Sequence, residues 1–406
     1  MEHREPLDAK VVLSATSDSV RAVNTRRIIR AVMVMPSTQV QLARRTRLSQ
    51  ATVSGVVGRL QSDGLVDVDE ADGDRGKRIR LAPMRGVAVG VEVGHDKLTV
   101  AVRRVDSEQM LQHTGDLGVS QGGRAWIKES ARLIDDLVRR TGMTTSDMVS
   151  IGLGIPAAVD PRTGRVTQAA SSLGWDLRGD PQEWYEPHYP GVPVVVDNEA
   201  NLAAFGEHLY GAGRDTETML FVKASTGIGS GLIIGGVIFR GRHGFAGEIG
   251  HLTMDPSGIV CRCGNRGCLE TLVGGTRLVE EVRQAYAGHR IDLPVNVGGL
   301  IERARNHDPV SLRVLQDAGR NIGLALARVC NIINPETVVL GGELGRAGDM
   351  ILRYVDDELR RNVLVGMLEH PDPVGVRQSE LGLLAGAQGA LAFALNSDRP
   401  LAGTSH

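Results

Sequence analysis

The stretch from Gly247 to Glu270, GEIGHLTMDPSGIVCRCGNRGCLE, restricts the fold of this chain more than any other part of it. It contains three of the four cysteines, Cys261, Cys263 and Cys268, and His251 lies shortly before them. Three thiolates and one imidazole form the ligand set of a closed, tetrahedral zinc site. Loop thiols or a disulfide are the alternative, but two cysteines separated by a single residue bridge poorly. The spacing therefore predicts a structural Zn²⁺ bound by these four residues.

Length and charge limit the possible organisation of the chain. Its 406 residues exceed one ordinary hydrophobic core, so two or three domains are expected. The formal net charge of -2 argues against a uniformly basic nucleic-acid binder, but residues 20–60 contain eight arginines, no lysine and no acid. The N-terminus lacks an apolar signal core, and no apolar run is long enough to span a bilayer. We therefore expect a cytoplasmic protein without membrane contact.

The arginine-rich segment has the pattern of three helices. The first runs from about Val20 to Met33, a short second helix ends near Thr46, and Ser49 is a suitable N-cap for the third. In the third helix, apolar residues recur at helical spacing, which buries one face and turns polar side chains outward. The residues of this apolar face are Val53, Val56, Val57 and Leu60. Two helices joined by a tight turn, the second carrying small polar and basic residues, are typical of a helix-turn-helix.

Two short strands near 65–68 and 79–81, joined by the polar loop DEADGDRGKR, would add the wing of a winged helix. We expect this DNA-binding domain at residues 20–82, after a flexible segment at 1–19. A solvated helical face or a protein-docking bundle would show similar periodicity, but the absence of acids favours DNA. The residues expected to contact DNA are Arg44, Arg47, Gln50, Thr52, Ser54, Arg59, Arg75, Lys77 and Arg78.

From Gly86 onward, short β-branched strands are interrupted by glycine. VAVGVEVG followed by KLTVAVRRV resembles MLFVKASTGIGSG followed by LIIGGVIF, which is a weak internal repeat. The repeat predicts two similar α/β lobes that face each other across a cleft. We expect the first lobe at 83–198 together with 380–400, and the second lobe, with the zinc loop, at 199–379. Polar residues that follow the buried strand VPVVV would point into the cleft.

These features together resemble the ROK family of bacterial sugar kinases and sugar-responsive repressors. The N-terminal segment resembles its repressor branch, and the TGIGSG turn resembles its second phosphate loop. The stretch 247–270 matches the family signature of GE-hydrophobic-GH followed by CxCGxxGCxE, which fixes two acids, a histidine and three cysteines in order. The resemblance implies an α/β chain, in which an N-terminal winged helix-turn-helix precedes a two-lobed actin-like (ribonuclease H-like) ATPase fold.

The resemblance also implies a sugar site. By position, Asn198, Glu248, His251 and Glu270 would bind sugar hydroxyls, with His251 also or instead a metal ligand. Carboxylates accept hydrogen bonds from hydroxyls, and the asparagine amide can both donate and accept. Structural roles remain open beside these, because Glu248 could cap a helix and Glu270 could pair with a neighbouring arginine. The arginines in question are Arg262 and Arg266.

Two departures from the family pattern argue against kinase activity. Where the kinases carry an Asp-x-Gly-Gly-Thr-like loop for ATP phosphates, this chain has acidic residues at Glu92 and Asp96, and anionic side chains oppose a polyphosphate. Glu199 occupies the place of the catalytic aspartate, and its longer side chain displaces the carboxylate from the sugar hydroxyl. The Asn-Glu-Ala-Asn stretch resembles the xylose-repressor subgroup. We therefore expect no catalytic residue, and place Glu199 among the sugar ligands.

The sequence thus predicts a sugar-responsive transcriptional regulator, a repressor of carbohydrate-utilisation genes, that binds operator DNA as a homodimer or homotetramer. A small sugar or sugar phosphate in the interlobe cleft would alter operator binding. One alternative is an ATP-dependent hexose kinase that retains a DNA-binding domain, and another is a zinc-dependent interaction scaffold without a sugar ligand. Sugar-dependent ATP turnover would favour the first, and the failure of every sugar to shift the melting temperature would favour the second.

Overall fold

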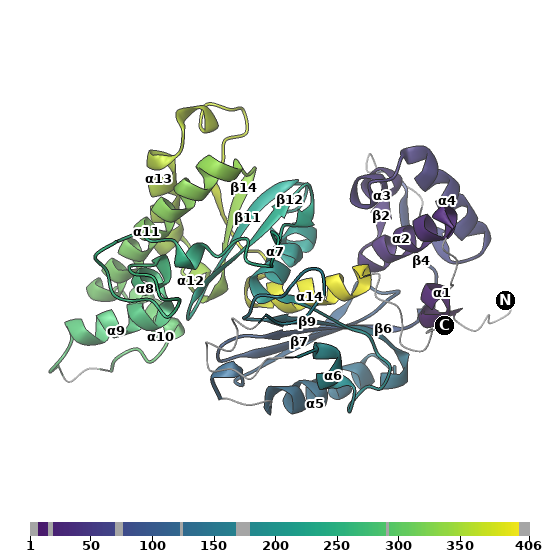
Figure 1. Cartoon of the computed structure of the whole chain (residues 1–406), viewed down its shortest axis with the longest axis horizontal. Helices are drawn as coiled ribbons and strands as arrows, with labels where there is room; N and C mark the ends of the chain where they lie inside the picture. Colours follow the sequence, from purple (N-terminus) through teal and green to yellow (C-terminus); the bar gives the residue numbers. More distant parts are fainter. Residues whose placement is uncertain are drawn as a thin grey trace.

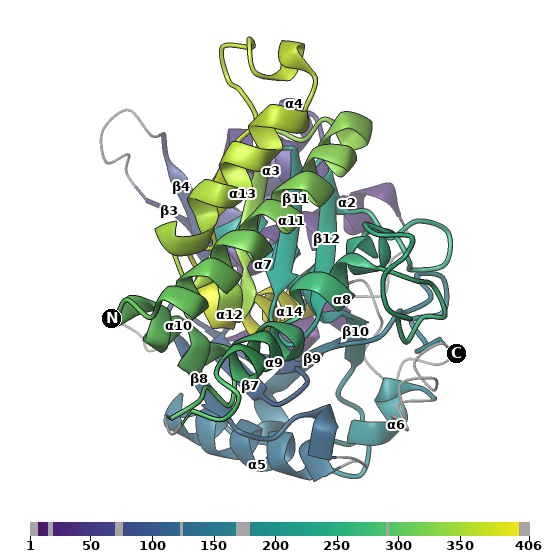
Figure 2. The same ribbon diagram turned by 90° about the vertical axis from the view of Figure 1, so that its left-hand side faces the viewer.

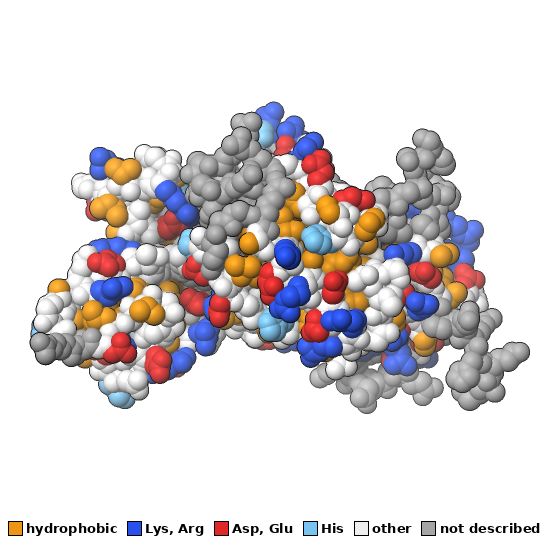
Figure 3. Space-filling model, turned by 90° about the horizontal axis from the view of Figure 1, so that it is seen from below, with side chains coloured by type: hydrophobic (Ala, Val, Ile, Leu, Met, Phe, Trp, Pro, Cys, Tyr) orange, Lys and Arg blue, Asp and Glu red, His pale blue; other side chains and the backbone are white. Residues whose placement is uncertain are grey.

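The computed structural model describes residues 7–14, 19–69, 76–121, 125–167, 179–289 and 292–397. It contains a winged helix and two α/β lobes, with the helix α14 between the lobes (Figure 1). The predicted fold class is confirmed. In the part of the chain that the structure describes, no helix is long and apolar enough to cross a membrane. On the face shown in Figure 3, basic and acidic side chains are interspersed, in keeping with the net charge of -2.

The winged helix forms as its sequence pattern predicts. The side chains of Ser19, Thr38 and Ser49 each accept a hydrogen bond from a first-turn backbone N–H, which fixes where the three helices begin. Arg47 closes the second helix in the left-handed conformation, with φ of 54°. The strands pair in the order β2-β4-β3. The elements are α2 (Val20–Val34), β2 (Ser37–Thr38), α3 (Gln39–Thr46), α4 (Gln50–Ser62), β3 (Val66–Val68) and β4 (Arg78–Leu81).

Part of the N-terminal segment that was expected to be flexible is ordered. Residues Leu7–Asp8 form β1, which pairs in parallel with β5 (Met84–Arg85), and α1 (Ala9–Ser14) follows. Ala9 is fully buried. The polar composition of this segment did not reveal the pairing, because the partner strand lies far along the chain.

The first lobe is built on a five-stranded sheet of order β10-β9-β6-β7-β8. Alternate residues of β6 face opposite sides, so the valines pack toward α5 while Ala88 packs toward α14. Figure 2 shows α5 on the outer side of this sheet. The elements are β6 (Val87–Val93), β7 (Leu98–Arg104), β8 (Met110–Gly115), α5 (Ala125–Arg140), β9 (Met148–Ile155), α6 (Pro181–Tyr185), β10 (Val194–Asn198) and α14 (Ala385–Asn396).

The second lobe repeats this plan with a sheet of order β13-β12-β11-β14-β15. In β11, Leu220 and Val222 pack toward the outer helices, while Met219 and Phe221 belong to the interlobe core beside α7. The strands are β11 (Thr218–Ala224), β12 (Ile228–Ile234), β13 (Val237–Ile238), β14 (Thr337–Gly341) and β15 (Val376–Gln378). The helices are α7 (Glu199–Tyr210), α8 (Leu269–Val273), α9 (Gly275–Ala285), α10 (Val297–Arg305), α11 (Pro309–Ile333), α12 (Gly342–Gly345) and α13 (Asp349–Asn362).

The helices α7 and α14 cross between the lobes at very close range. A Cβ on Gly389 would overlap the carbonyl oxygen of Leu202, so only glycine permits this approach. α14 also packs against α2. One hydrophobic cluster therefore runs from the winged helix through α14 and α7 to the inner faces of both sheets.

Candidate functional site

A cleft of ≈ 1460 Å³ separates the two lobes, and it is lined by every residue predicted to bind sugar. These residues are Asn198, Glu199, Glu248, His251 and Glu270. They come from the end of β10, the start of α7, the 3-10 turn Ile249–His251 and the start of α8. The glycine turn 225–227 and Gly342 also line this cleft. A monosaccharide would occupy only part of this volume.

The four predicted metal ligands are brought together by the loop. Their ligand atoms all lie within 4.8 Å of one another. The Sγ atoms of Cys263 and Cys268 are 3.7 Å apart, and Cys261 Sγ lies 3.6 Å from His251 Nδ1. Tetrahedral bonds of about 2.3 Å to sulfur and 2.1 Å to nitrogen require separations of about 3.8 and 3.6 Å. The donor set and its spacing therefore fit a tetrahedral metal ion.

His251 serves two sides of the site. Its Nδ1 faces Cys261, while Nε2 lies 3.8 Å from Oε2 of Glu248. One imidazole can thus bind a metal through Nδ1 and leave Nε2 available toward the cleft. Glu248 is the residue before the 3-10 turn but makes no side-chain capping hydrogen bond there, so the helix-capping alternative does not hold. Burial raises the pKa of the Glu248 carboxyl group.

Glu270 is held by two groups. Its Oε2 accepts a hydrogen bond from the backbone N–H of Ile228 at 3.1 Å, and its Oε1 lies 3.2 Å from Arg262 Nε. The ion pair with Arg262 that the sequence left open is therefore present. It does not remove Glu270 from the cleft, because both Glu270 and Arg262 line it.

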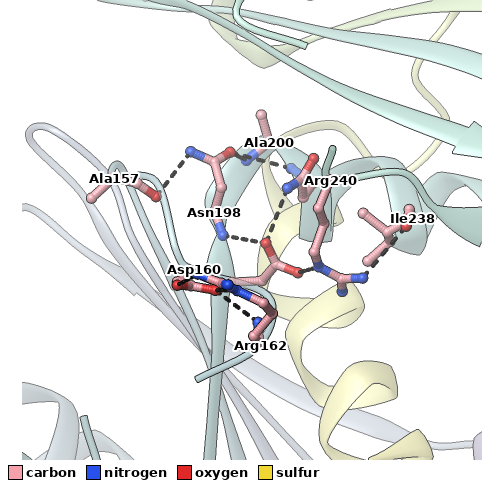
Figure 4. A network of polar contacts seen from close by, with 9 residues as sticks. Ala157, Asp160, Arg162, Asn198, Ala200, Ile238 and Arg240 are labelled. Carbon is pink, nitrogen blue, oxygen red and sulfur yellow. Dashed lines mark hydrogen bonds and ion pairs between the residues drawn. The ribbon is translucent and has the colours of Figure 1, made fainter. Parts of the chain in front are cut away.

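Asn198 is fixed by a buried network at the end of β10 (Figure 4). Its Oδ1 accepts hydrogen bonds from the N–H groups of Ala200 at 2.8 Å and Asn201 at 3.3 Å, which makes it the N-cap of α7. Asp197, only 2% exposed, accepts a hydrogen bond from Asn201 Nδ2 at 3.0 Å and pairs with Arg240 Nε at 2.5 Å. Arg240 belongs to the second lobe, so its ion pair with Asp197 links the end of β10 in the first lobe to the second lobe.

Lys223 forms a charge cluster that sequence reasoning missed. Its Nζ lies 2.6 Å from Oε2 of Glu199 and also bonds Oε1 of Glu92, and the three side chains are 16%, 18% and 9% exposed. We call Glu92, Glu199 and Lys223 the charge triad. Alternation along β11 explains the contact, because Lys223 follows Met219 and Phe221 on the face toward α7.

One ammonium group in the charge triad faces two carboxylates. Burial raises the pKa of Glu199; Lys223 opposes this rise and Glu92 adds to it. Burial disfavours the charge of Lys223, but the two carboxylates outweigh it and raise the pKa of the ammonium group. Glu92 Oε2 is buried and has no hydrogen-bond partner among the described residues. The Glu199 carboxylate is therefore engaged by a cation of the chain itself.

The turn after β6 lines the cleft, and its Asp96 side chain is held by neighbouring side chains. Asp96 accepts a hydrogen bond from Ser120 at 2.6 Å and lies 3.0 Å from His95 Nδ1. Burial disfavours the charge of this carboxylate, yet the hydrogen bonds from Ser120 and His95 hold its pKa below the ordinary value. An ionised carboxylate here repels an anionic ligand.

The residues expected to contact DNA have different surroundings. Gln50 and Ser54 are exposed on α4, whereas Thr52 and Arg59 are partly buried. Lys77 and Arg78 are exposed beside the wing, and Arg75 lies outside the described residues. The remaining two, Arg44 and Arg47, contact the second lobe. Arg44 Nε pairs with Glu217 Oε1 at 3.1 Å, and Arg47 Nη2 donates to the Gly235 carbonyl at 2.9 Å.

The fold and the cleft define a two-lobed, actin-like protein with an N-terminal winged helix. The profile of the ROK family matches residues 88–397, and that of the MarR family matches residues 23–75. The chain belongs to the ROK family.

Relatives of both branches of the family are similar to this chain. A putative xylose repressor of Caldicellulosiruptor sp. (strain Rt8B.4) is 27% identical over 358 residues, which cover 85% of this chain and 88% of that protein. A ROK family glucokinase from Streptomyces griseus, solved in complex with glucose and AMPPNP, is 27% identical with a TM-score of 0.66 over 77% of this chain and 100% of that chain. A ROK family transcriptional regulator, a homolog of the E. coli MLC protein, has a TM-score of 0.70 at 22% identity, over 94% of this chain and 98% of that chain. At that identity it supports the fold alone.

Proposed function

We propose that this protein is a sugar-responsive, DNA-binding transcriptional regulator that represses carbohydrate-utilisation genes. The observation that carries the proposal is that one chain combines a winged helix with an interlobe cleft, which is lined by groups suited to sugar hydroxyls and in which Glu199 pairs with Lys223. The similarity to a putative xylose repressor across most of the chain, winged helix included, supports it.

A sugar would bind between the lobes through Asn198, Glu199, Glu248, His251 and Glu270. Carboxylates and the Asn198 amide are suited to hydroxyl groups, and both lobes contribute residues to the cleft. A ligand that contacts both lobes favours one angle between them, and shifts the equilibrium by its differential affinity for the two arrangements. The effector is a small sugar or a sugar phosphate.

A structural Zn²⁺ would be held by His251, Cys261, Cys263 and Cys268. Zinc prefers cysteine and histidine ligands, and the donor atoms of these four residues lie within 4.8 Å of one another. The ion would tie the loop that carries Glu270 to the turn that carries Glu248. When bound, it supplies rigidity and not chemistry, because four protein ligands leave no open position.

Kinase activity is the second candidate, since the chain is also similar to a glucokinase. The charge triad argues against it. A general base must accept the proton of the sugar hydroxyl, but Oε2 of Glu199 already accepts a hydrogen bond from Lys223 Nζ at 2.6 Å. We therefore assign the chain no catalytic residue and no enzymatic activity.

The regulator would act in the cytoplasm on operator DNA as a homodimer or homotetramer. Two winged helices related by symmetry would read the two halves of a pseudo-palindromic operator. Their contacts would come from α4, from neighbouring arginines and from the wing.

A thermal-shift screen with pentoses, hexoses and their phosphates tests the proposal, followed by DNA-binding measurements with each sugar that stabilises the protein. At a sugar concentration of about 100 Kd, binding stabilises the folded state by about 2.7 kcal/mol, which is easily detected. A coupled ATP assay with the same sugars is expected to show no turnover. The absence of any sugar-dependent shift, or sugar-dependent ATP turnover lost in Glu199→Gln, would contradict the proposal.

A further inference from the structure

The winged helix contacts the two lobes at two places of unequal strength. At the first, the C-terminal end of α2 is held in the interior. Val34 O accepts hydrogen bonds from Arg103 Nη1 and Tyr210 Oη, both at 3.0 Å, and Met33 O accepts another from Arg103. Arg103 is only 3% exposed, and α2 packs against α14 in the same region. This contact is continuous with the hydrophobic core and is expected to persist.

The second place is on the surface, and we call it the α3–lobe contact. Arg44 Nε pairs with Glu217 Oε1 at 3.1 Å, and its Nη2 donates to the Asp215 carbonyl at 3.3 Å. Arg47 Nη2 donates to the Gly235 carbonyl at 2.9 Å. The side chains of Arg44 and Glu217 are 49% and 57% exposed. An ion pair exposed to this extent stabilises by less than about 1 kcal/mol, so it can open readily.

The α3–lobe contact lies on the second lobe alone, whereas the first contact joins α2 to both lobes, because Tyr210 ends α7 of the second lobe. Arg103 lies on β7 of the first lobe. Glu217 precedes β11, and Gly235 lies in the turn between β12 and β13. The N–H of Gly236 donates to the Glu217 carbonyl at 2.9 Å, so both segments lie at the same end of the second-lobe sheet. A change in the angle between the lobes therefore strains the α3–lobe contact first, because it is the weaker of the two.

The chemistry of the contact matches that of a DNA backbone. Two guanidinium groups bind a carboxylate and two carbonyl oxygens here, and guanidinium groups bind phosphate oxygens by the same charged hydrogen bonds. Both arginines lie beside the start of α4, where Gln50 is exposed. The second lobe thus engages Arg44 and Arg47, which lie at the edge of the surface that would face DNA.

We propose that the second lobe competes with the DNA backbone for Arg44 and Arg47, and that movement of the lobes releases them. The inference rests on the proposed DNA binding and adds the route by which the interlobe angle reaches the winged helix. In the docked state the two arginines are withheld from phosphate. In the released state they add to the affinity for DNA.

Binding of the full-length protein to a random-sequence duplex of about 30 base pairs tests this, by fluorescence anisotropy at about 50 mM salt, where phosphate contacts are strong. Glu217→Ala is expected to raise the affinity about two- to five-fold, since an exposed ion pair is worth up to about 1 kcal/mol. In the Arg44→Gln background, the same substitution is expected to change the affinity little, because the released group is absent.

Glu380→Ala is the matched control. Glu380 pairs with Arg214 at 3.1 Å, the two side chains are 55% and 53% exposed, and Arg214 is the neighbour of Asp215 in the chain. This variant removes the same charge from an equally exposed pair that does not include the winged helix. Equal gains in both alanine variants, a gain that survives Arg44→Gln, or weaker binding by Glu217→Ala would overturn the competition. A wild-type protein that binds no duplex would overturn the proposed function along with it.

Discussion

Replacement of Lys223 by methionine tests the charge triad most severely. Methionine keeps an unbranched apolar stem but leaves the carboxylates of Glu92 and Glu199 without their shared cation. Both carboxylates bond the same Nζ, so they lie within about 5 Å of each other, and at an effective dielectric constant near 20 their repulsion is about 3 kcal/mol. Removal of one partner from a buried ion pair costs about 3–5 kcal/mol. We expect Lys223→Met to lower the free energy of unfolding at pH 7.5 by about this amount.

The loss should depend on pH with a defined sign. Without the ammonium group, burial and repulsion by Glu92 raise the pKa of the Glu199 carboxyl group in the folded state further above the unfolded value of about 4.3. A group with a raised folded pKa favours folding below its unfolded pKa, and this contribution is lost as the pH rises through the folded pKa. The stability difference between wild type and Lys223→Met should therefore be smaller at pH 5 than at pH 7.5.

Urea unfolding followed by circular dichroism at the two pH values measures this difference. The double variant Glu92→Gln with Lys223→Met removes the repulsion and is expected to recover about 2 kcal/mol or more. A loss under about 1 kcal/mol at pH 7.5, or a loss that does not change with pH, would refute the account of the triad.

Two further predictions concern the predicted zinc loop and the close contact between α7 and α14. Cys263→Ser is expected to abolish zinc retention, measured by atomic emission, and to lower the melting temperature, whereas Cys330→Ala, in α11, keeps the metal; retention of zinc by Cys263→Ser would contradict the site. Gly389→Ala is expected to cost more than about 2 kcal/mol in urea unfolding, because its Cβ would overlap the Leu202 carbonyl. Gly55→Ala is the control for it, since a Cβ on Gly55 meets nothing within 4 Å and should be neutral or stabilising. Equal stabilities of the two glycine variants would argue against close packing of α7 on α14.

Local patterns sufficed to predict much of the structure. The spacing of Cys261, Cys263 and Cys268 predicted a cluster, and their ligand atoms do converge with His251. Capping residues and periodicity located the helices of the winged helix, since those signals lie within the helices themselves. The cleft is lined by all five residues that were predicted to bind sugar.

Contacts between distant segments were not predictable from local patterns. Lys223 and Glu92 are 131 residues apart, and Arg44 meets Glu217 across 173 residues. Alternation along β6 and β11 does place Glu92 and Lys223 on the inner faces of their sheets, but only the crossing of the lobes brings them together. The pairing of β1 with β5 depends in the same way on tertiary packing.

The central claim is that a sugar in the interlobe cleft changes DNA binding. Its most direct test begins with duplexes selected by the full-length protein from a random library. The dissociation constant for the selected duplex is then measured without and with the sugar that gives the largest thermal shift. We expect a change of at least about five-fold, which is the lower range of typical coupling between two sites, and its loss in Glu248→Gln. A sugar that stabilises the protein but leaves this dissociation constant unchanged would contradict the claim.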